Sequence, residues 1–137
     1  MRINHMFHKV SDDTDVAVAS NYNVANKSTI FLSSFPASAL HFSGRLSSLA
    51  IDCKAIGGTV STLTVRMTSD PAGDHCIMSD TEADLSICRG LTTNTEASIV
   101  YKLDIDWVMP VSESLYIFYK TDTSTLTVDK AIMVWRE

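Results

Sequence analysis

The chain has 137 residues, of which 20% are charged and 45% hydrophobic, and its formal net charge is -5. This length fits one domain that can bury a sizeable core, and the composition is that of a globular protein. The acidic balance argues against a nucleic-acid-binding protein, which usually carries a basic surface. No apolar run reaches the length of a membrane-spanning helix, and the N-terminus lacks the apolar stretch of a secretory signal.

The first 45 residues have little periodicity. Residues 16–19 and 29–32 are rich in the residue types that favour strands, and the stretches around them are rich in Asn and Ser, as loops are. No clear pattern covers residues 1–13. We therefore predict a short N-terminal arm over residues 1–13 and one folded domain over residues 14–137.

A strong two-residue alternation begins after residue 48. In "LAIDCKA", residues 49–55, the odd positions are apolar, which is typical of a half-buried strand. Gly57 and Gly58 follow, and apolar residues alternate again over residues 63–67. Because Gly-Gly is a strong turn signal between two alternating segments, the sequence predicts a hairpin here.

The middle of the chain alternates turn and strand signals. The stretch "SDPAGD", residues 69–74, has the Pro and Gly of a turn. We predict a short strand over residues 76–78 and another near residues 83–89. A long alternating apolar stripe then runs over residues 99–107, and Pro110 ends it.

The C-terminal stretch predicts two further strands. "LYIFY", residues 115–119, is apolar on both faces, as a central and well-covered strand is, and a turn follows at residues 121–124. Alternation resumes over residues 126–135, which indicates a last strand locked into a sheet. Altogether the pattern predicts an all-β, single-domain, jelly-roll-like β-sandwich of about eight strands.

No group of residues predicts catalysis. The four histidines lack the convergent spacing of a metal site, and the acidic residues between Asp70 and Asp84 match no calcium-loop spacing, although a bound calcium ion stays an open alternative. Asp104 and Asp106 share one strand face without further catalytic groups. We therefore predict no enzyme, no metal and no cofactor. The three cysteines are expected to be reduced thiols, and whether Cys76 pairs with Cys88 is left open.

Aromatic residues suggest a binding surface instead. Tyr116 and Phe118 share the face of their strand opposite Leu115, Ile117 and Tyr119. If the latter face the core, the other face needs a cover, which could be a second sheet, another subunit or a ligand. An exposed ring at Tyr116 or Trp107 would suit a carbohydrate-binding platform.

Residues 46–137 resemble a known group of proteins. "TLTVRMTSDPAGD", the acidic stretch after it, the "KLDID" strand and the terminal "TDTSTLTVDKAIMVW" unit are similar, in style and order, to small jelly-roll proteins of tailed bacteriophage particles. The resemblance implies a virion structural protein, most simply a capsid decoration (cement) protein. A carbohydrate-binding or receptor-binding module of a tail or fibre is the alternative.

The resemblance also implies partners. We expect the major capsid protein or other virion proteins, a symmetric homo-oligomer such as a trimer, neither nucleic acid nor membrane, and synthesis in a host cytoplasm before assembly into the virion. The candidate interface residues lie in the arm and on the strand predicted over residues 115–119: Arg2, Met6, Phe7, Tyr116 and Phe118.

Overall fold

The computed structural model describes residues 6–31, 41–56, 60, 62–85, 96–110, 114–122 and 126–136. For residues 6, 7, 41–45, 104–110, 135 and 136 it describes the backbone and not the side chains. Within this part of the chain no helix is long and apolar enough to cross a membrane.

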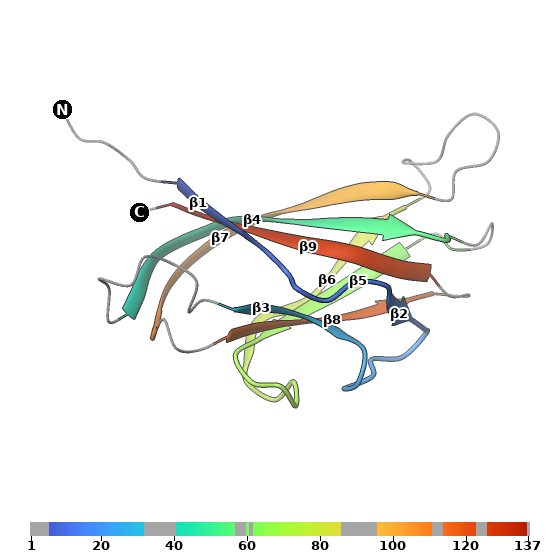
Figure 1. The fold of residues 1–137 in the computed structure, drawn as a ribbon, viewed down its shortest axis with the longest axis horizontal. Helices are drawn as coiled ribbons and strands as arrows, with labels where there is room; N and C mark the ends of the chain where they lie inside the picture. The colour runs from blue at the N-terminus through green and yellow to red at the C-terminus, as the bar shows by residue number, and fades with distance from the viewer. Residues whose placement is uncertain are drawn as a thin grey trace.

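The described residues form nine strands in two antiparallel sheets that pack face to face (Figure 1). Sheet A has the order β1-β9-β4-β7, with β2 also paired to β9, and sheet B has the order β3-β8-β5-β6. The strands are β1 (Met6–Val10), β2 (Val16–Val18), β3 (Lys27–Phe31), β4 (His41–Lys54), β5 (Thr62–Thr68), β6 (Cys76–Asp84), β7 (Ala97–Pro110), β8 (Ser114–Thr121) and β9 (Leu126–Arg136).

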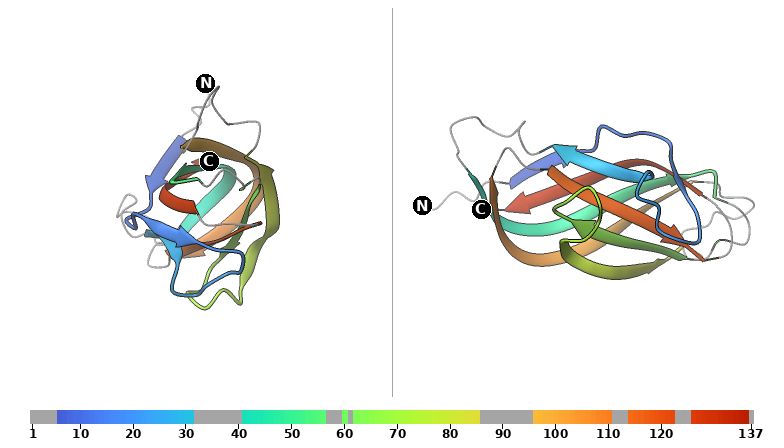
Figure 2. Two further views of the ribbon diagram at one scale, coloured as in Figure 1. Left: turned by 90° about the vertical axis from the view of Figure 1, so that its right-hand side faces the viewer. Right: turned by 90° about the horizontal axis from the view of Figure 1, so that it is seen from below.

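Consecutive strands alternate between the sheets. From β2 to β9 every connection crosses from one sheet to the other, except the connection between β5 and β6. A five-stranded and a four-stranded layer connected in this way form a jelly-roll-like sandwich. The predicted all-β, jelly-roll-like sandwich is therefore confirmed, and the two sheets can be followed in the end-on view of Figure 2.

The predicted hairpin around Gly57 and Gly58 is wrong. Its two strands exist as β4 and β5, but β4 pairs with β7 and β9, whereas β5 pairs with β6 and β8. Ala55 has a φ of 52°, which turns the chain out of sheet A, and Ile56 and Val60 are buried in the core. The chain therefore leaves sheet A after Lys54 and joins sheet B at Thr62, and the two buried residues described between them pack in the core.

The C-terminal strand-turn-strand unit is divided in the same way. β8 is a central strand of sheet B, and β9 lies inside sheet A between β1 and β4, so the two strands never pair. The prediction that the last strand is locked into a sheet is confirmed. Of the separate strand predicted near residues 83–89, the first two residues belong to β6, which runs from Cys76 to Asp84, and residues 86–89 lie outside the described part of the chain.

The core lies between the sheets. Side chains from the inner faces of both sheets fill it, among them Leu49, Ile51, Leu63, Ile117 and Met133, all fully buried.

Two buried tyrosine hydroxyls have hydrogen-bond partners. Tyr101 of sheet A donates to the Leu63 carbonyl of sheet B at 2.8 Å, and Tyr119 donates to the Ser28 hydroxyl at 2.6 Å. Burial raises the pKa of both tyrosines above the ordinary range, so both hydroxyls stay protonated and donate.

The predicted flexible arm is wrong for residues 6–10. Met6–Val10 form β1, which pairs antiparallel with β9, and Ser11 continues the contact. The Ser11 amide donates to the Ala131 carbonyl at 2.8 Å, and the Ala131 amide donates to the Ser11 hydroxyl at 3.0 Å. The segment is therefore held by backbone pairing, which no local periodicity reveals. Residues 1–5 lie outside the described part of the chain.

Shortening the N-terminus tests this assignment. Deleting residues 1–5 retains all of β1, so the melting temperature should stay within about 2 °C of the parent chain. Deleting residues 1–10 removes about four hydrogen bonds, each worth about 0.5–1.5 kcal/mol, and should lower the melting temperature by roughly 10 °C. Calorimetry on both variants measures the difference. Equal melting temperatures would show that β1 does not stabilise the sheet.

Candidate functional site

Partners and ligands can reach this domain only at its outer faces, edges and loops, because side chains fill the space between the sheets. The outer face of each sheet is therefore a candidate binding surface. Residues directly opposite each other on paired strands point to the same side, so the register identifies the members of each face.

Phe118 lies on the outer face of sheet B and is nevertheless only 3% exposed. In register it lies between Lys27 of β3 and Arg66 of β5. The loop between β5 and β6 covers its ring: a Cβ added to Gly73 would stand 3.3 Å from the Phe118 ring. The Lys27 ammonium lies 6.0 Å from the centre of the same ring.

The sequence predicts that this strand face needs a cover. At Phe118 that cover is a loop of the chain itself. Phe118 as an interface residue is a wrong prediction, since its ring is not available to a partner.

Asp70 holds the covering loop in place. Its carboxylate accepts hydrogen bonds from the His75 amide at 2.6 Å and the Asp74 amide at 3.1 Å. The hydrogen bond from the His75 amide and the others from the backbone lower the pKa of Asp70 below its ordinary value. The turn predicted from "SDPAGD" is confirmed, and Gly73 supplies its positive φ of 83°.

A second loop folds onto the same face through Tyr22. The Tyr22 hydroxyl donates to the Asp80 carboxylate of β6 at 2.8 Å, and the Lys120 ammonium lies 4.9 Å from the centre of the Tyr22 ring. Burial, together with the neighbouring Asp80, raises the pKa of Tyr22 above its ordinary range. These contacts attach the β2–β3 connection to the outer face of sheet B.

Two aromatic side chains on this face keep exposed surface. Tyr116 is half-buried and Phe31 is 42% exposed. In register Tyr116 lies opposite Thr29, and Phe31 lies two residues further along β3, so the two rings are diagonal neighbours on one face. They form the aromatic pair of sheet B.

The outer face of sheet A carries an apolar row across four strands. Val10 of β1 lies opposite Ile132 of β9, Ile132 opposite Ala50 of β4, and Ala50 opposite Val100 of β7. Val10, Ala50 and Ile132 are half-buried, and Val100 is 61% exposed. We call these four residues the apolar rung.

Polar residues flank the apolar rung on both sides along the strands. One neighbouring rung holds Asp52, Ser98 and Lys130, and the other holds the polar residues His8, Ser48 and Lys102 together with the apolar Val134. An apolar centre with a polar surround is the usual anatomy of a protein–protein interface.

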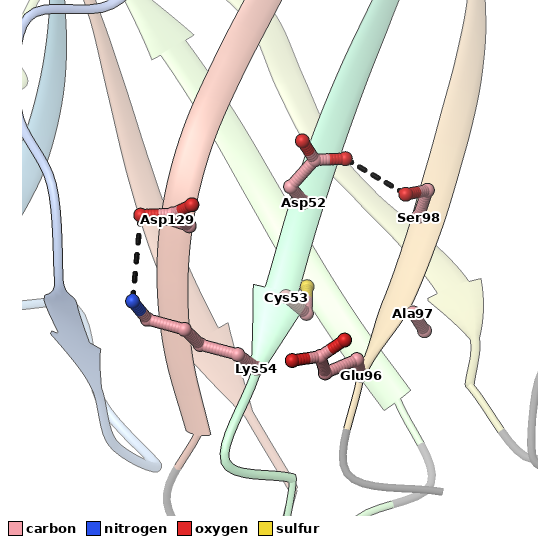
Figure 3. A pocket seen from close by; sticks show the side chains of 7 residues that line it. All are labelled: Asp52, Cys53, Lys54, Glu96, Ala97, Ser98 and Asp129. Carbon is pink, nitrogen blue, oxygen red and sulfur yellow. Dashed lines mark hydrogen bonds and ion pairs between the residues drawn. The ribbon is translucent and has the colours of Figure 1, made fainter.

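A groove of about 400 Å³ lies at the acidic end of this face (Figure 3). The residues that line it include three carboxylates, Asp52, Glu96 and Asp129. Asp52 accepts a hydrogen bond from the Ser98 hydroxyl at 2.7 Å. Lys54 pairs with Asp129 at 3.5 Å and with Asp15, and the hydrogen bond with Asp15 is the main cause that raises the pKa of Lys54.

The structure also places the acidic residues that the sequence suggests as metal ligands. Among the described residues no group of three or more His, Cys, Asp or Glu side chains could hold a metal ion. Asp70 and Asp74 lie in the covering loop, whereas Asp80, Glu82 and Asp84 are exposed on β6.

Several other residues named in the sequence analysis lie partly or wholly outside the described part of the chain. Cys76 is an exposed free thiol, and Cys88 lies outside the described residues. The backbones of Met6 and Phe7 lie in β1, and those of Asp104, Asp106 and Trp107 lie in β7. Their side chains, and all of Arg2, lie outside the described part.

No protein-family model matches this sequence, and no curated protein is similar to it in sequence. Among solved structures, the CBM36-1 domain of a xylanase from the hindgut metagenome of Trinervitermes trinervoides is 6% identical, with 94% of this chain and 96% of that chain covered and a TM-score of 0.49.

Two further solved structures have lower TM-scores. FLHE is 15% identical, with 97% and 96% covered and a TM-score of 0.42. The VP2 subviral particle of infectious bursal disease virus is 12% identical, with 96% of this chain and 32% of that chain covered and a TM-score of 0.37. Because these likenesses carry no argument on function, we base the function on the two outer faces.

The ionisation of Asp70 predicts how the covering loop responds to pH. Because the folded pKa lies below the unfolded value of about 3.9, the stabilisation is complete above that pH and is lost as the pH falls through the folded pKa. Hydrogen-exchange protection of the Asp74 and His75 amides should therefore fall in acid. In Asp70→Asn, protection should be lower and nearly independent of pH.

Asp74→Asn is the matched control, since Asp74 is an exposed carboxylate in the same loop and its contact with Asp70 is through its backbone amide. This control should keep the protection and pH profile of the parent chain. An Asp70→Asn variant with an unchanged profile would contradict the role of the carboxylate.

Proposed function

We propose that this chain is a non-enzymatic structural protein of a virion, a capsid decoration protein that stabilises the shell by bridging capsid subunits. The observation that carries the proposal is the apolar rung on the outer face of sheet A. In this proposal the chain binds the major capsid protein or other virion proteins, and it acts as a symmetric homo-oligomer. It would be made in the host cytoplasm and then join the virion.

The shape of the rung favours a macromolecular partner. A small-molecule site is concave and encloses most of its ligand, whereas the apolar rung crosses the width of an open sheet face. Burying such a face against another protein removes its apolar surface from water, which contributes about 25 cal/mol per Å². The resemblance of residues 46–137 to phage-particle proteins supports the same class of partner.

The carboxylate groove supports binding rather than catalysis. Asp52 is hydrogen-bonded to Ser98, and Asp129 is paired with Lys54, so both carboxylates are held by ordinary surface partners. No described group beside them has the arrangement of a nucleophile with its base. The proposal therefore assigns no reaction to this domain.

The first test is a census of purified particles from the source by quantitative mass spectrometry. A decoration protein should be present in copy numbers comparable to those of the main shell protein, because it covers a repeated lattice position. A copy number below about one tenth of the shell protein would assign the chain to a tail or fibre. Its absence from particles would refute a virion role.

The aromatic pair of sheet B favours one second function, carbohydrate or receptor binding in a phage tail or fibre. Phe31 and Tyr116 are neighbours on one face and both keep exposed ring surface. Aromatic rings with an apolar face and a polar edge can stack on sugars while water solvates their rims. This function would use sheet B and leave the apolar rung free for assembly.

A glycan-array screen, followed by calorimetry on any hit, tests this second function. Phe31→Ala and Tyr116→Ala should each weaken binding at least tenfold, because each removes one stacking ring. Val24→Ala is the control, since Val24 is an exposed apolar residue on a loop and not an aromatic ring. Binding that survives both aromatic substitutions would exclude this pair as the platform.

A further inference from the structure

The apolar rung needs an occupant, because its four side chains are neighbours on one outer face and none of them is fully buried. Its four members come from four of the five strands of the sheet, and the most exposed member, Val100, stands on β7. Apolar side chains lined up across a sheet form one continuous strip, which is more adhesive than scattered single residues.

We infer that the outer face of sheet A binds the same face of a second copy of this chain, around a two-fold axis that runs along the apolar rung. This inference rests on the proposed function, and it deepens that function by naming the partner of this surface. In such a contact the same patch is used by both copies, so the rung of one copy packs on the rung of the other.

The charges beside the rung complement each other under this symmetry. A two-fold axis along the rung keeps β7 over β7 and reverses the strand direction. It therefore places Lys102 of one copy over Ser98 of the other. Asp52 is adjacent to Ser98 on the neighbouring strand and is hydrogen-bonded to it at 2.7 Å. The contact brings each Lys102 ammonium to a carboxylate of the second copy.

The supply of charges supports this pairing. Within the described residues no ion pair involves Lys102, whose side chain is exposed. At the other end of the face, Lys130 lies opposite Asp52 in register, and the groove holds Asp52, Glu96 and Asp129 with one lining cation, Lys54. That cation is already shared between Asp15 and Asp129. The acidic end therefore has negative charge in excess, and the second copy supplies the cation.

The size of the face is also sufficient. β4 and β7 have 14 residues each, β9 has 11 and β1 has 5. With about 3.3 Å per residue and about 4.8 Å between strands, the outer face covers roughly 700 Å². Standard protein–protein interfaces bury about 600–1,000 Å² per partner, so a dimer would use most of this face.

Such a dimer explains physically how the protein could bridge two capsid subunits. With the two sheet A faces buried against each other, the two sheet B faces point in opposite directions. Each then presents the same side chains to a different neighbour. A shell protein that instead occupied sheet A would leave the free chain monomeric, so the mass of the isolated protein separates the two occupants.

The experiment is sedimentation equilibrium of the full chain over about 1–300 µM. The parent chain should show a reversible monomer–dimer equilibrium. Val100→Asp places a charge at the most exposed member of the apolar rung, at its β7 end, and should raise the dissociation constant at least tenfold. Val24→Asp is the matched control: the same substitution at a 55% exposed valine on a loop away from sheet A should leave the dimer unchanged.

A charge exchange tests the orientation of the two copies. Lys102→Glu and Asp52→Lys should each weaken the dimer several-fold, because each places like charges together. The double variant should recover most of the loss, because the pair is restored with its signs reversed. Circular dichroism of each variant verifies that the sheets are retained.

The results that would overturn the two-fold contact differ from those that would overturn the virion role. A parent chain that stays monomeric at 300 µM, a trimer, or a dimer insensitive to Val100→Asp would each exclude the two-fold contact. None of these results touches the virion role, which depends on the particle census. Conversely, a dimer with the expected variant pattern would stand even if the chain were absent from particles.

Discussion

The burial of two sheet faces against each other is the constraint on which the rest of this structure depends. Because six of the eight connections between consecutive strands cross from one sheet to the other, neither sheet is a local unit of the chain. β9, the last strand, lies between the first strand and β4, and the Tyr101 hydroxyl links the two sheets at the Leu63 carbonyl. The sheets therefore stabilise each other, and their outer faces are left for binding.

The sequence predicts the strands better than it predicts their partners. Alternation over residues 49–55 and 63–67 identifies which side chains face the core, and the structure buries Leu49, Ile51, Leu63 and Val65 accordingly. Alternation carries no information on whether the next strand lies beside the first or across the core. Gly57 and Gly58 favour a turn in both cases, and the left-handed backbone of Ala55 gives no signal in the sequence.

The outer faces were less predictable because they depend on register and on loops. The sequence places Phe118 opposite the core-facing residues, but only the backbone geometry of the covering loop at Gly73 reveals that its ring is buried. The apolar rung combines residues 10, 50, 100 and 132, which no local window contains. Its register also depends on the irregularity between Leu46 and Ser48 in β4, which shifts the pairing with both neighbours.

The two candidate functions require different ligands for the outer face of sheet B. Both are served by the same pairing of two copies through sheet A. A decoration protein must hold two shell subunits at once, and a sugar-binding protein gains affinity when two weak sites act together. Both therefore gain from two identical faces at a fixed spacing. A single sandwich has one sheet B face, with Phe31 and Tyr116 beside the loops that cover Phe118. Pairing through the apolar rung doubles this face without changing the fold, so the role of sheet A can be established before the ligand of sheet B is known.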